Sequence, residues 1–371
     1  MNHIILTLRV INVTKKDNTA TPPTFLRQLT TREYPGLTHL LQTSPDAGQI
    51  QIAPFYHLDA FTAFSLQNKD ALGVIAEDPE TSEIVGAGFI SFGNGNVLGE
   101  QRRYAALKGL VVHPAYRKQG IGKQLAHKRL ELARDRLGSD GFIIATIQKN
   151  NAASLSVASK WGKPLPAIIT GGATKMRGRA PESLPGIQVK LINHASNEKL
   201  QILAEQANQY FVNYNFYESE TEGTLRAWME NSPFDSPLCH YYVATDSSGE
   251  FLAGVKVTEQ YRLVEMRVQQ IPAYMRLLNK MLQIVPDNGI MKQLMVSSLW
   301  FSPGRLKEAQ YLWETIRWEW RDRASTIVSF FDSRSPMAQV VRLPAWMPRA
   351  SMSVYVSQRE LVSSDRLVHF F

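Results

Sequence analysis

The segment from Leu110 to Leu125 constrains the fold more than any other part of this 371-residue chain. It begins with the apolar run Leu110-Val111-Val112, which predicts a buried strand. Pro114 ends this run, and a basic turn with two glycines, Gly120 and Gly122, then leads into a segment that predicts a long helix. The chain must therefore place a glycine turn between a strand and a helix.

A glycine turn in this position predicts a site for a phosphate group. The first backbone N–H groups of a helix have no partner within the helix, and the helix dipole adds partial positive charge there. Such a turn can hold a phosphate or pyrophosphate. Two common glycine loops do not fit, because a dinucleotide fingerprint needs glycine at Leu125 and a Walker loop needs glycine at Arg117 and Ser or Thr at Gln124.

The turn instead resembles the Arg/Gln-x-x-Gly-x-Gly loop of the GNAT acyltransferase superfamily, with Arg117-Lys118-Gln119-Gly120-Ile121-Gly122. The approach to the loop is similar too, with Val112, Pro114, Tyr116 and Arg117 in a Val-x-Pro-x-Tyr-Arg pattern. Downstream, a strand is predicted at 141–146. Asn151, Ser154 and Gly162 then follow the family's Asn-x-x-Ala and Gly-Phe spacing, although Lys163 stands where the aromatic residue is usual.

A faint internal repeat predicts the architecture. In the first half, strands are predicted at 72–77 and 84–92, ahead of the strand, loop and helix described above. The second half repeats this order with predicted strands at 242–245, 251–255, 294–303 and 326–331 and a predicted helix at 307–321. Its loop has Glu308 and Ala309 where the paired glycines would stand, and side chains there would keep a pyrophosphate away from the backbone. We expect the second copy to keep the fold and to have lost cofactor binding.

The predicted fold class is α/β (α+β), with two tandem GNAT-like domains, each a mixed, mostly antiparallel central sheet flanked by helices. The length and the 44% of hydrophobic residues suit two domains with separate cores. The expected divisions are an N-terminal strand and linker at 1–24, an acyl-CoA-binding GNAT domain at 25–163, a linker at 164–186 and a degenerate GNAT-like domain at 187–371. The proline- and glycine-rich linker segment could instead be a long ordered loop over the domain interface.

The resemblance implies transfer of an acetyl or other acyl group from acyl-CoA, usually acetyl-CoA, to an amine that attacks the thioester directly in a ternary complex. A backbone N–H near Val111 or Val112 would polarise the thioester oxygen, the loop amides would bind the pyrophosphate, and Asn151 would contact the pantetheine arm. The residues implied in acyl-CoA binding are Leu110, Val111, Val112, Arg117, Lys118, Gln119, Gly120, Ile121, Gly122, Lys123, Asn151 and Ser154.

Two catalytic groups of the family pattern are missing. The tyrosine acid usual seven positions after the asparagine is replaced by Ala158, and the acidic base on the loop strand by Gly109 and Lys108. We interpret Lys108 as a solvated side chain. The substitute candidates are Tyr56, His57, Glu100 and Tyr104, with a terminal carboxylate at Phe371 as a further alternative. The gaps leave open a second function, a non-catalytic acyl-CoA sensor or structural pseudoenzyme.

Composition limits the partners of this chain. The formal charge of +8 concentrates partly at the loop, and no nucleic-acid recognition motif accompanies it, so we expect no nucleic-acid partner. The N-terminal residues do not resemble a signal peptide, and no apolar run approaches a membrane span. One cysteine, Cys239, argues for a reducing compartment and a buried structural thiol, so we expect a cytoplasmic protein. The expected partner is a small-molecule or peptide amine acceptor, with a possible homo-oligomer, no membrane and no metal.

Overall fold

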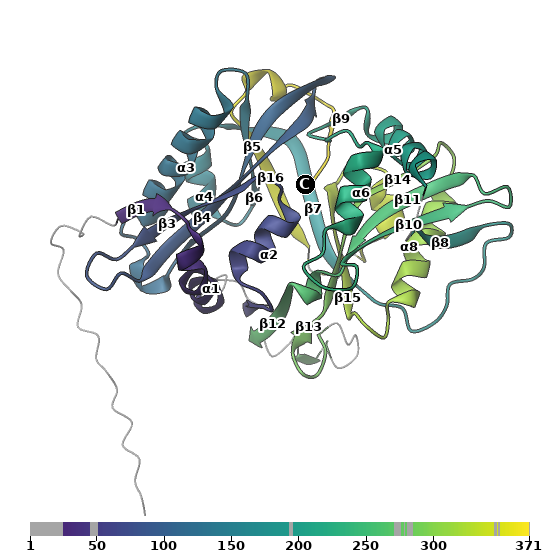
Figure 1. The fold of residues 1–371 in the computed structure, drawn as a ribbon, viewed down its shortest axis with the longest axis horizontal. Helices are drawn as coiled ribbons and strands as arrows, with labels where there is room; N and C mark the ends of the chain where they lie inside the picture. Colours follow the sequence, from purple (N-terminus) through teal and green to yellow (C-terminus); the bar gives the residue numbers. More distant parts are fainter. Residues whose placement is uncertain are drawn as a thin grey trace, which may run out of the picture.

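The computed structural model describes residues 25–44, 51–192, 196–270, 276, 277, 279, 285–344, 347 and 349–370. The strand predicted at residues 4–13 and the rest of the segment 1–24 lie outside these residues. A sheet of 12 strands in the described residues runs through the molecule in the order β1-β3-β4-β5-β6-β16-β7-β15-β14-β11-β10-β8 (Figure 1). No helix in these ranges is long and apolar enough to cross a membrane.

The first half of the sheet has the predicted order of elements. Its strands are β1 (Phe25–Gln28), β3 (Ala71–Glu77), β4 (Ile84–Val97), β5 (Glu100–Val112), β6 (Phe142–Gln148) and β7 (Lys163–Lys175). The strands β3, β4 and β5 pair antiparallel, whereas β5 and β6 pair parallel with helix α3 (Ile121–Leu137) between them in sequence. This arrangement confirms the strands and the helix predicted around the glycine turn.

The second half repeats this arrangement, as the internal repeat predicts. Its strands are β8 (Gln188–Ile192), β10 (Cys239–Thr245), β11 (Phe251–Thr258), β14 (Gln293–Phe301), β15 (Thr326–Asp332) and β16 (Ala350–Val356). Again three consecutive strands of the sheet, β10, β11 and β14, pair antiparallel, and β14 pairs parallel with β15 across helix α8 (Leu306–Glu319). The mixed, mostly antiparallel sheet of each half is therefore confirmed.

Helices cover both faces of the sheet because neighbouring strand residues point to opposite sides. On β3, Val74 and Ala76 pack with α3, whereas Ile75 packs with α1 (Tyr34–Thr43) and α2 (Ala60–Gln67). On β10, Ala244 packs with α8, whereas Val243 packs with α5 (Asn197–Phe211) and α6 (Glu222–Glu230). Each half thus has a core on both faces of its strands.

Short elements complete the structure. The helices are α4 (Ala152–Ala158) and α9 (Met337–Val341), with 3-10 turns at Thr31–Glu33, Pro114–Tyr116, Gln260–Arg262 and Arg359–Leu361. The strand β2 (Gln51–Tyr56) pairs with β12 (Val264–Gln270), which pairs with β13 (Ile290–Met291), and β9 (Tyr214–Asn215) pairs with β17 (Leu367–Val368). The β2–β12 pair ties the two halves together outside the main sheet.

The predicted linker at 164–186 takes a different form over its first part. Strand β7 occupies residues 163–175 and pairs with β15 on one side and β16 on the other. Its glycines serve packing, since a Cβ at Gly171 would overlap the ring of Phe330 and one at Gly172 would lie 3.0 Å from Leu343. These glycines resemble those of a linker in sequence, but in the structure they leave room for Phe330 and Leu343 to pack against a central strand. Residues 176–187 contain no helix or strand.

Strand β16 crosses from the second half of the chain into the first half of the sheet. It lies antiparallel between β6 and β7, so that Val354 faces Thr146 across one ladder. The two halves consequently share one continuous sheet, and the division of the chain into domains at 25–163 and 187–371 stays a prediction.

Candidate active site

The parallel strands β5 and β6 separate at their C-terminal ends. They pair only from Tyr104–Leu107 to Phe142–Ala145, and β5 then continues to Val112. Strand β6 stays paired with β16 from Ile144 to Gln148 while it diverges from β5. Among the described residues, no strand pairs with β5 on this side from Lys108 to Val112, so its backbone faces an opening in the sheet.

A β-bulge at Gly109 lies at the start of this opening. The register between β4 and β5 shifts between Ala87 and Phe89, and Gly109 has the left-handed backbone value φ +56°. A Cβ at this position would lie 2.6 Å from Cδ2 of Phe89, so both the backbone angle and the close ring require glycine. Bulges bend a strand locally, and this one coincides with the separation of β5 from β6.

The register of β5 decides which amide points into the opening. The N–H of His113 donates to the carbonyl oxygen of Val85 at 2.8 Å, toward β4. Because backbone groups alternate in direction along an antiparallel strand, the N–H of Val112 points away from β4. Consistently, the Val112 carbonyl on that side accepts from Nε of Arg117 at 3.1 Å. Of the two predicted donors, this geometry favours Val112 over Val111.

The glycine turn leaves backbone amides exposed at the start of α3. Lys118 and Gly120 have φ values of +66° and +84°, and α3 begins at Ile121. In the described part of the chain, no protein group accepts from the N–H groups of Gly120, Ile121 and Gly122. The buried side chain of Ile121 anchors the first turn under the sheet. The turn therefore presents free donors at the positive end of a helix dipole, which suits a phosphate group.

Asn151 and Ser154 form the N-terminal cap of α4. The Oδ1 atom of Asn151 accepts from the N–H of Ser154 at 3.1 Å. This bond explains the spacing of the two residues by helix capping, since it satisfies one of the free donors of the first turn. Their contact with a pantetheine arm stays a prediction.

The equivalent turn of the second half is closed to an anion. Helix α8 follows Gly304 (φ +78°), but the exposed Arg305 donates to the carboxylate of Glu308 at 3.2 Å. That buried carboxylate lies in the first turn, where an anionic ligand would otherwise compensate the dipole. The structure thus supports the prediction that this copy has lost the phosphate site.

The strand opening of the second half is also occupied. A bulge recurs on β14 at Ser298, which has φ +48°, and β14 pairs with β15 only as far as Val296. The C-terminal segment lies beyond this point. Nε2 of His369 is 3.3 Å from Oγ of Ser298, and the N–H of Val368 donates to Asp332 at 3.1 Å. In the second half, the C-terminal residues of the chain therefore occupy the opening between the two parallel strands, whereas the equivalent opening of the first half stays free of them.

A cavity of about 590 Å³ lies between the two halves. The first half contributes Tyr104 and Lys108 of β5 to its wall, and the second half contributes Glu218, Glu220 and Lys256. Lys256 and Glu220 form a buried ion pair. Lys108 belongs to both features, because it lines the cavity and begins the free edge of β5. The opening and the cavity consequently meet at this residue.

The four predicted catalytic side chains do not gather in one place. Tyr104 lines the cavity, and burial raises the pKa of its hydroxyl. Tyr56 packs against residues of both halves, and burial raises its pKa to about 12. His57 lies at the surface with Nε2 3.6 Å from Oε1 of Glu265, and Glu100 is exposed at the β4–β5 hairpin. Of these four, only Tyr104 lines the cavity, and the catalytic roles stay predictions.

Lys108 is the cavity residue that sequence reasoning undervalued. Its Nζ donates to Oδ1 of Asn68 at 2.6 Å, and burial lowers the pKa of the amine to about 8. The prediction of a solvated side chain is wrong, because the strand face that carries Tyr104 also turns Lys108 toward the second half. Its position on β5, the strand that leads to the glycine turn, was the one sequence feature that could have placed Lys108 near the site. No sequence feature pointed to Glu218 and Lys256, because only the tertiary fold brings them to the cavity wall that β5 also lines.

Asp332 of β15 and His369 of the C-terminal segment lie near the cavity, and both are held in the interior of the protein. Asp332 is fully buried and pairs with Arg334 at 2.6 Å. Burial lowers the pKa of His369 to about 3, so its ring is neutral at neutral pH. Phe370 lines the cavity, whereas Phe371, the alternative terminal carboxylate, lies outside the described residues.

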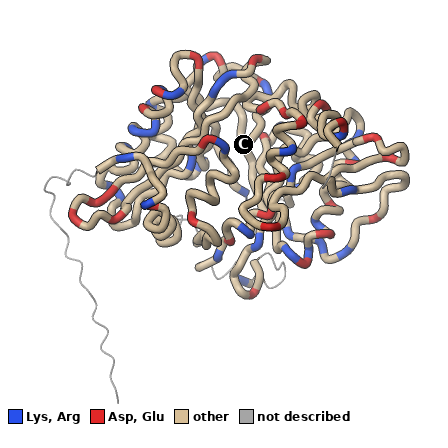
Figure 2. The backbone as a smooth tube through the Cα atoms, viewed as in Figure 1, with Lys and Arg blue, Asp and Glu red and all other residues tan. Residues whose placement is uncertain are grey.

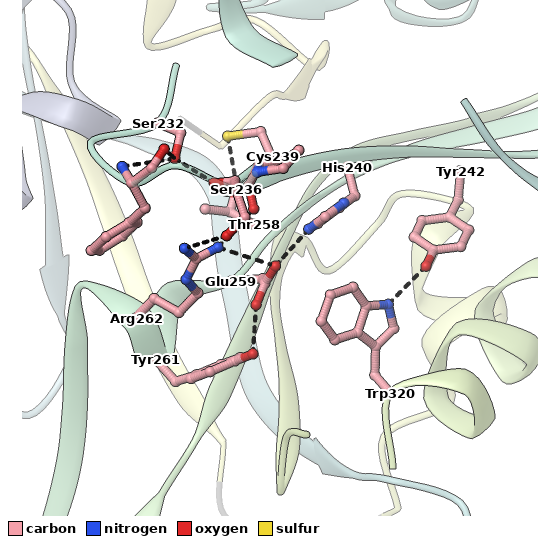
Figure 3. A network of polar contacts seen from close by, with 12 residues as sticks. Ser232, Ser236, Cys239, His240, Tyr242, Thr258, Glu259, Tyr261, Arg262 and Trp320 are labelled. Carbon is pink, nitrogen blue, oxygen red and sulfur yellow. Dashed lines mark hydrogen bonds and ion pairs between the residues drawn. The ribbon is translucent and has the colours of Figure 1, made fainter. Parts of the chain in front are cut away.

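Cys239 and His240 make separate contacts (Figure 3). The buried thiol of Cys239 lies 4.0 Å from Oγ1 of Thr258, and burial raises its pKa to about 11. His240 instead contacts Oε1 of Glu259 at 2.7 Å, and Tyr261 donates to the other oxygen of that carboxylate. A thiol held in its protonated form and turned away from histidine is a structural residue.

Neither the distribution of charged residues nor that of metal-ligating side chains indicates a further binding site in the described residues. Basic and acidic positions are interspersed over both halves (Figure 2). Within the described ranges, no three His, Cys, Asp or Glu side chains come together in a way that could hold a metal ion.

Residues 27–162 match the model of the acetyltransferase (GNAT) family, whereas no curated protein matches the chain in sequence. N-myristoyltransferase of Saccharomyces cerevisiae with bound myristoyl-CoA has a TM-score of 0.61 at 10% identity, over 96% of this chain and 86% of that one. A tandem GNAT protein from the clavulanic acid biosynthesis pathway has a TM-score of 0.57 at 13% identity, over 90% and 98%. A GCN5-related N-acetyltransferase from Sphaerobacter thermophilus has a TM-score of 0.54 at 14% identity, over 91% and 96%.

At these identities the solved structures establish the fold, and the family model adds the relation of the first half. Family and fold together support acyl transfer as the general activity. The chain therefore has a tandem GNAT-like fold, and its residues 27–162 match the model of the GNAT acetyltransferase family.

Proposed function

We propose that this chain transfers an acetyl group from acetyl-CoA to an amine held in the central cavity. The observation that carries the proposal is the free edge of β5, which runs from the exposed amides of the glycine turn to the cavity at Lys108. A ligand that has a pyrophosphate at one end and an extended arm with amide groups at the other fits this path. The amides of the arm would pair with the free strand edge as a neighbouring strand does.

In this proposal the protein acts mainly by alignment and by hydrogen bonding. The N–H of Val112 and its neighbours along the edge would hold the arm and polarise the thioester oxygen. The amine would attack the thioester carbon from the cavity, and the thiolate of CoA would leave. Holding both reactants in place converts a bimolecular step into an effectively unimolecular one.

Tyr104 has a place in the acceptor region rather than beside the leaving sulfur. It stands four residues before Lys108 on β5, which corresponds to about 13 Å along a strand. Its raised pKa keeps the hydroxyl protonated at neutral pH, so it can donate a hydrogen bond to an acceptor. The second half supplies the opposite wall of this region with Glu218 and the Glu220–Lys256 pair.

The test measures binding and turnover separately. Calorimetry with acetyl-CoA and with longer acyl-CoA thioesters identifies the donor, and release of free CoA thiol over a panel of amines identifies turnover. Binding of acetyl-CoA with thiol release on an amine supports the proposal. Absence of acyl-CoA binding refutes it.

A second candidate, a non-catalytic acyl-CoA sensor, is favoured by one observation. The position of the family's tyrosine acid is Ala158, which is buried and cannot donate a proton. Acyl-CoA binding without thiol release on any amine of the panel would support the sensor and refute the transferase.

A further inference from the structure

The side chain of Arg129 on α3 reaches the point where β5 separates from β6. Strand β5 makes its last pair with β6 at Leu107, and Lys108 is the next residue along β5. The Nη1 atom of Arg129 donates to the backbone carbonyl of Lys108 at 3.0 Å and to that of Phe89 on β4 at 3.4 Å. The guanidinium therefore spans the β4–β5 pair at the start of the opening.

These hydrogen bonds belong to the bulge between β4 and β5. The register of the two strands shifts between Ala87 and Phe89, and a bulge interrupts the ladder of backbone hydrogen bonds locally. The space for the guanidinium comes from Gly88, where a Cβ would lie 2.8 Å from Nε of Arg129. Arg129 thus supports the bulge, and with it the free edge of β5 beyond the bulge.

The positive charge of Arg129 is buried without a counter-ion. Arg129 is 4% exposed, and no carboxylate in the described part of the chain forms an ion pair with it. Its Nε atom also has no hydrogen-bond partner among those residues. Burial lowers the pKa of the guanidinium to about 10, so it stays charged at neutral pH. A buried charge of this kind costs stability, and an apolar side chain could fill the same space.

On the proposed function, the reactive end of acyl-CoA lies at the same place. An arm that starts at the glycine turn passes the wide end of the opening first and reaches Lys108 last. Attack by the amine moves negative charge onto the thioester oxygen, and departure of CoA moves it onto sulfur. A fixed positive charge beside the strand stabilises both anions, and it does so most strongly where water is excluded.

We propose that Arg129 is a positioning residue for acyl transfer, which fixes the bulge and stabilises through its buried charge the oxyanion formed at the edge of β5. This inference rests on the proposed function. In the step, the electron pair of the amine forms the N–C bond, and the π pair of the carbonyl moves to oxygen. The carbonyl then re-forms, the C–S bond breaks, and the thiolate of CoA takes the proton that nitrogen releases. The products are an N-acyl amine and CoA.

This role also accounts for the missing acid of the family pattern. Ala158 stands at the position of the tyrosine and cannot protonate the leaving sulfur. A thiolate that is stabilised by a nearby positive charge leaves without a proton donor beside it. The buried cation and the absent acid are therefore consistent with each other.

Three substitutions in the full chain separate the charge from the hydrogen bonds. Arg129→Lys keeps the charge, Arg129→Gln keeps a neutral donor, and Arg129→Met removes both. The Gln and Met variants should lower kcat about 10- to 100-fold, somewhat less than the loss of a direct oxyanion donor. Their KM for acetyl-CoA should change little, which marks an interaction made in the transition state. Arg129→Lys should keep most of kcat, and Arg134→Met, which removes an exposed charge from the same helix, is the matched control and should keep all of it.

A spectroscopic measurement needs no acceptor and does not respond to a purely structural role. Infrared difference spectra of acetyl-CoA, isotope-labelled at the thioester carbonyl, report how strongly the bound carbonyl is polarised. The band should lie at lower wavenumber in the wild-type complex than in water. It should stay there in Arg129→Lys and move back toward the water value in Arg129→Gln. Thermal unfolding of each variant identifies any loss of the fold.

The possible results separate this inference from the proposed function. Acetyl transfer by the wild-type chain, with kcat and the carbonyl band unchanged in folded Arg129→Gln, overturns the inference and leaves the proposed function standing. A wild-type band at the water value overturns the inference whether or not the variants fold. Equal losses of kcat in Arg129→Lys and Arg129→Gln, with the band unmoved, assign Arg129 a packing role and also overturn it. Failure of the wild-type chain to bind acetyl-CoA overturns both.

Discussion

Gly122 is the second residue of α3, where a side chain can be added without strain on the fold. A Cβ at this position would meet only Cγ2 of Val112, at an ordinary contact distance of 3.7 Å. Replacement of a helical glycine by glutamate recovers about 1 kcal/mol of helix propensity. An acidic side chain in the first turn adds about 0.3–1 kcal/mol through the helix dipole. Gly122→Glu should therefore raise the free energy of unfolding by about 1–2 kcal/mol.

The same substitution should weaken acetyl-CoA binding. A carboxylate about 4 Å from a phosphate charge costs about 1 kcal/mol in water and about 4 kcal/mol at an effective dielectric constant of 20. The loop is exposed, so we expect a loss of about 2–4 kcal/mol for the pyrophosphate, which corresponds to about 30- to 1,000-fold in Kd. Stability and affinity should thus change in opposite directions, which a misfolded variant cannot imitate.

The assays are thermal unfolding and calorimetric titration with acetyl-CoA, with two matched controls. Gly122→Ala adds a methyl group without charge and should change Kd by no more than a few-fold. Gly223→Glu places the same charge at the second position of α6, outside the loop and the cavity lining, and should leave Kd unchanged. An unchanged affinity in Gly122→Glu, together with a raised melting temperature, would refute the assignment of the turn as the pyrophosphate site.

Three further substitutions or deletions test the fold around the site. Gly109→Ala should cost about 2–4 kcal/mol in urea unfolding, because the left-handed backbone and the ring of Phe89 both oppose a side chain. The Arg27 guanidinium holds the pKa of Glu33 down at about 2, so unfolding free energy measured against pH should fall from about pH 4.5 toward pH 2. Glu33→Gln should remove this part of the pH dependence, and an unchanged curve would contradict it. A chain that ends at residue 344 lacks β16 and should lose most of the roughly 5–15 kcal/mol typical of a folded protein, seen as loss of a cooperative thermal transition.

The sequence predicted correctly those elements that are determined by interactions between residues close together in the chain. The glycine turn, the strands before it and the helix after it depend on residues close in sequence, and the structure has them at the predicted places. The repeat could be found for the same reason, since each copy keeps its own hydrophobic pattern. The loss of the loop in the second copy depends on Glu308 and Ala309, which the sequence shows directly.

Features that depend on residues far apart in the chain could not be predicted from local sequence patterns. The prolines and glycines of β7 are typical of a linker, and only the Phe330 ring on the neighbouring strand explains Gly171. The cavity is similar, because Lys108 and Glu218 come together only when the two halves share one sheet. The place of His57 also depends on distant residues, because β2 pairs with β12 and leaves the exposed His57 beside the buried carboxylate of Glu265.

The path of β16 accounts for a structural difference between the two related halves. Each half has a bulged strand that separates from its parallel neighbour, so each begins with the same opening. The chain continues through β16 into the first half and then returns, so that residues 368 and 369 fill the opening of the second half. This path leaves the β5 edge free and brings the wall of the second half to face it. The loss of the glycine turn in one copy and the occupation of its opening by the tail are therefore consistent with each other, and both favour one donor site, beside Lys108.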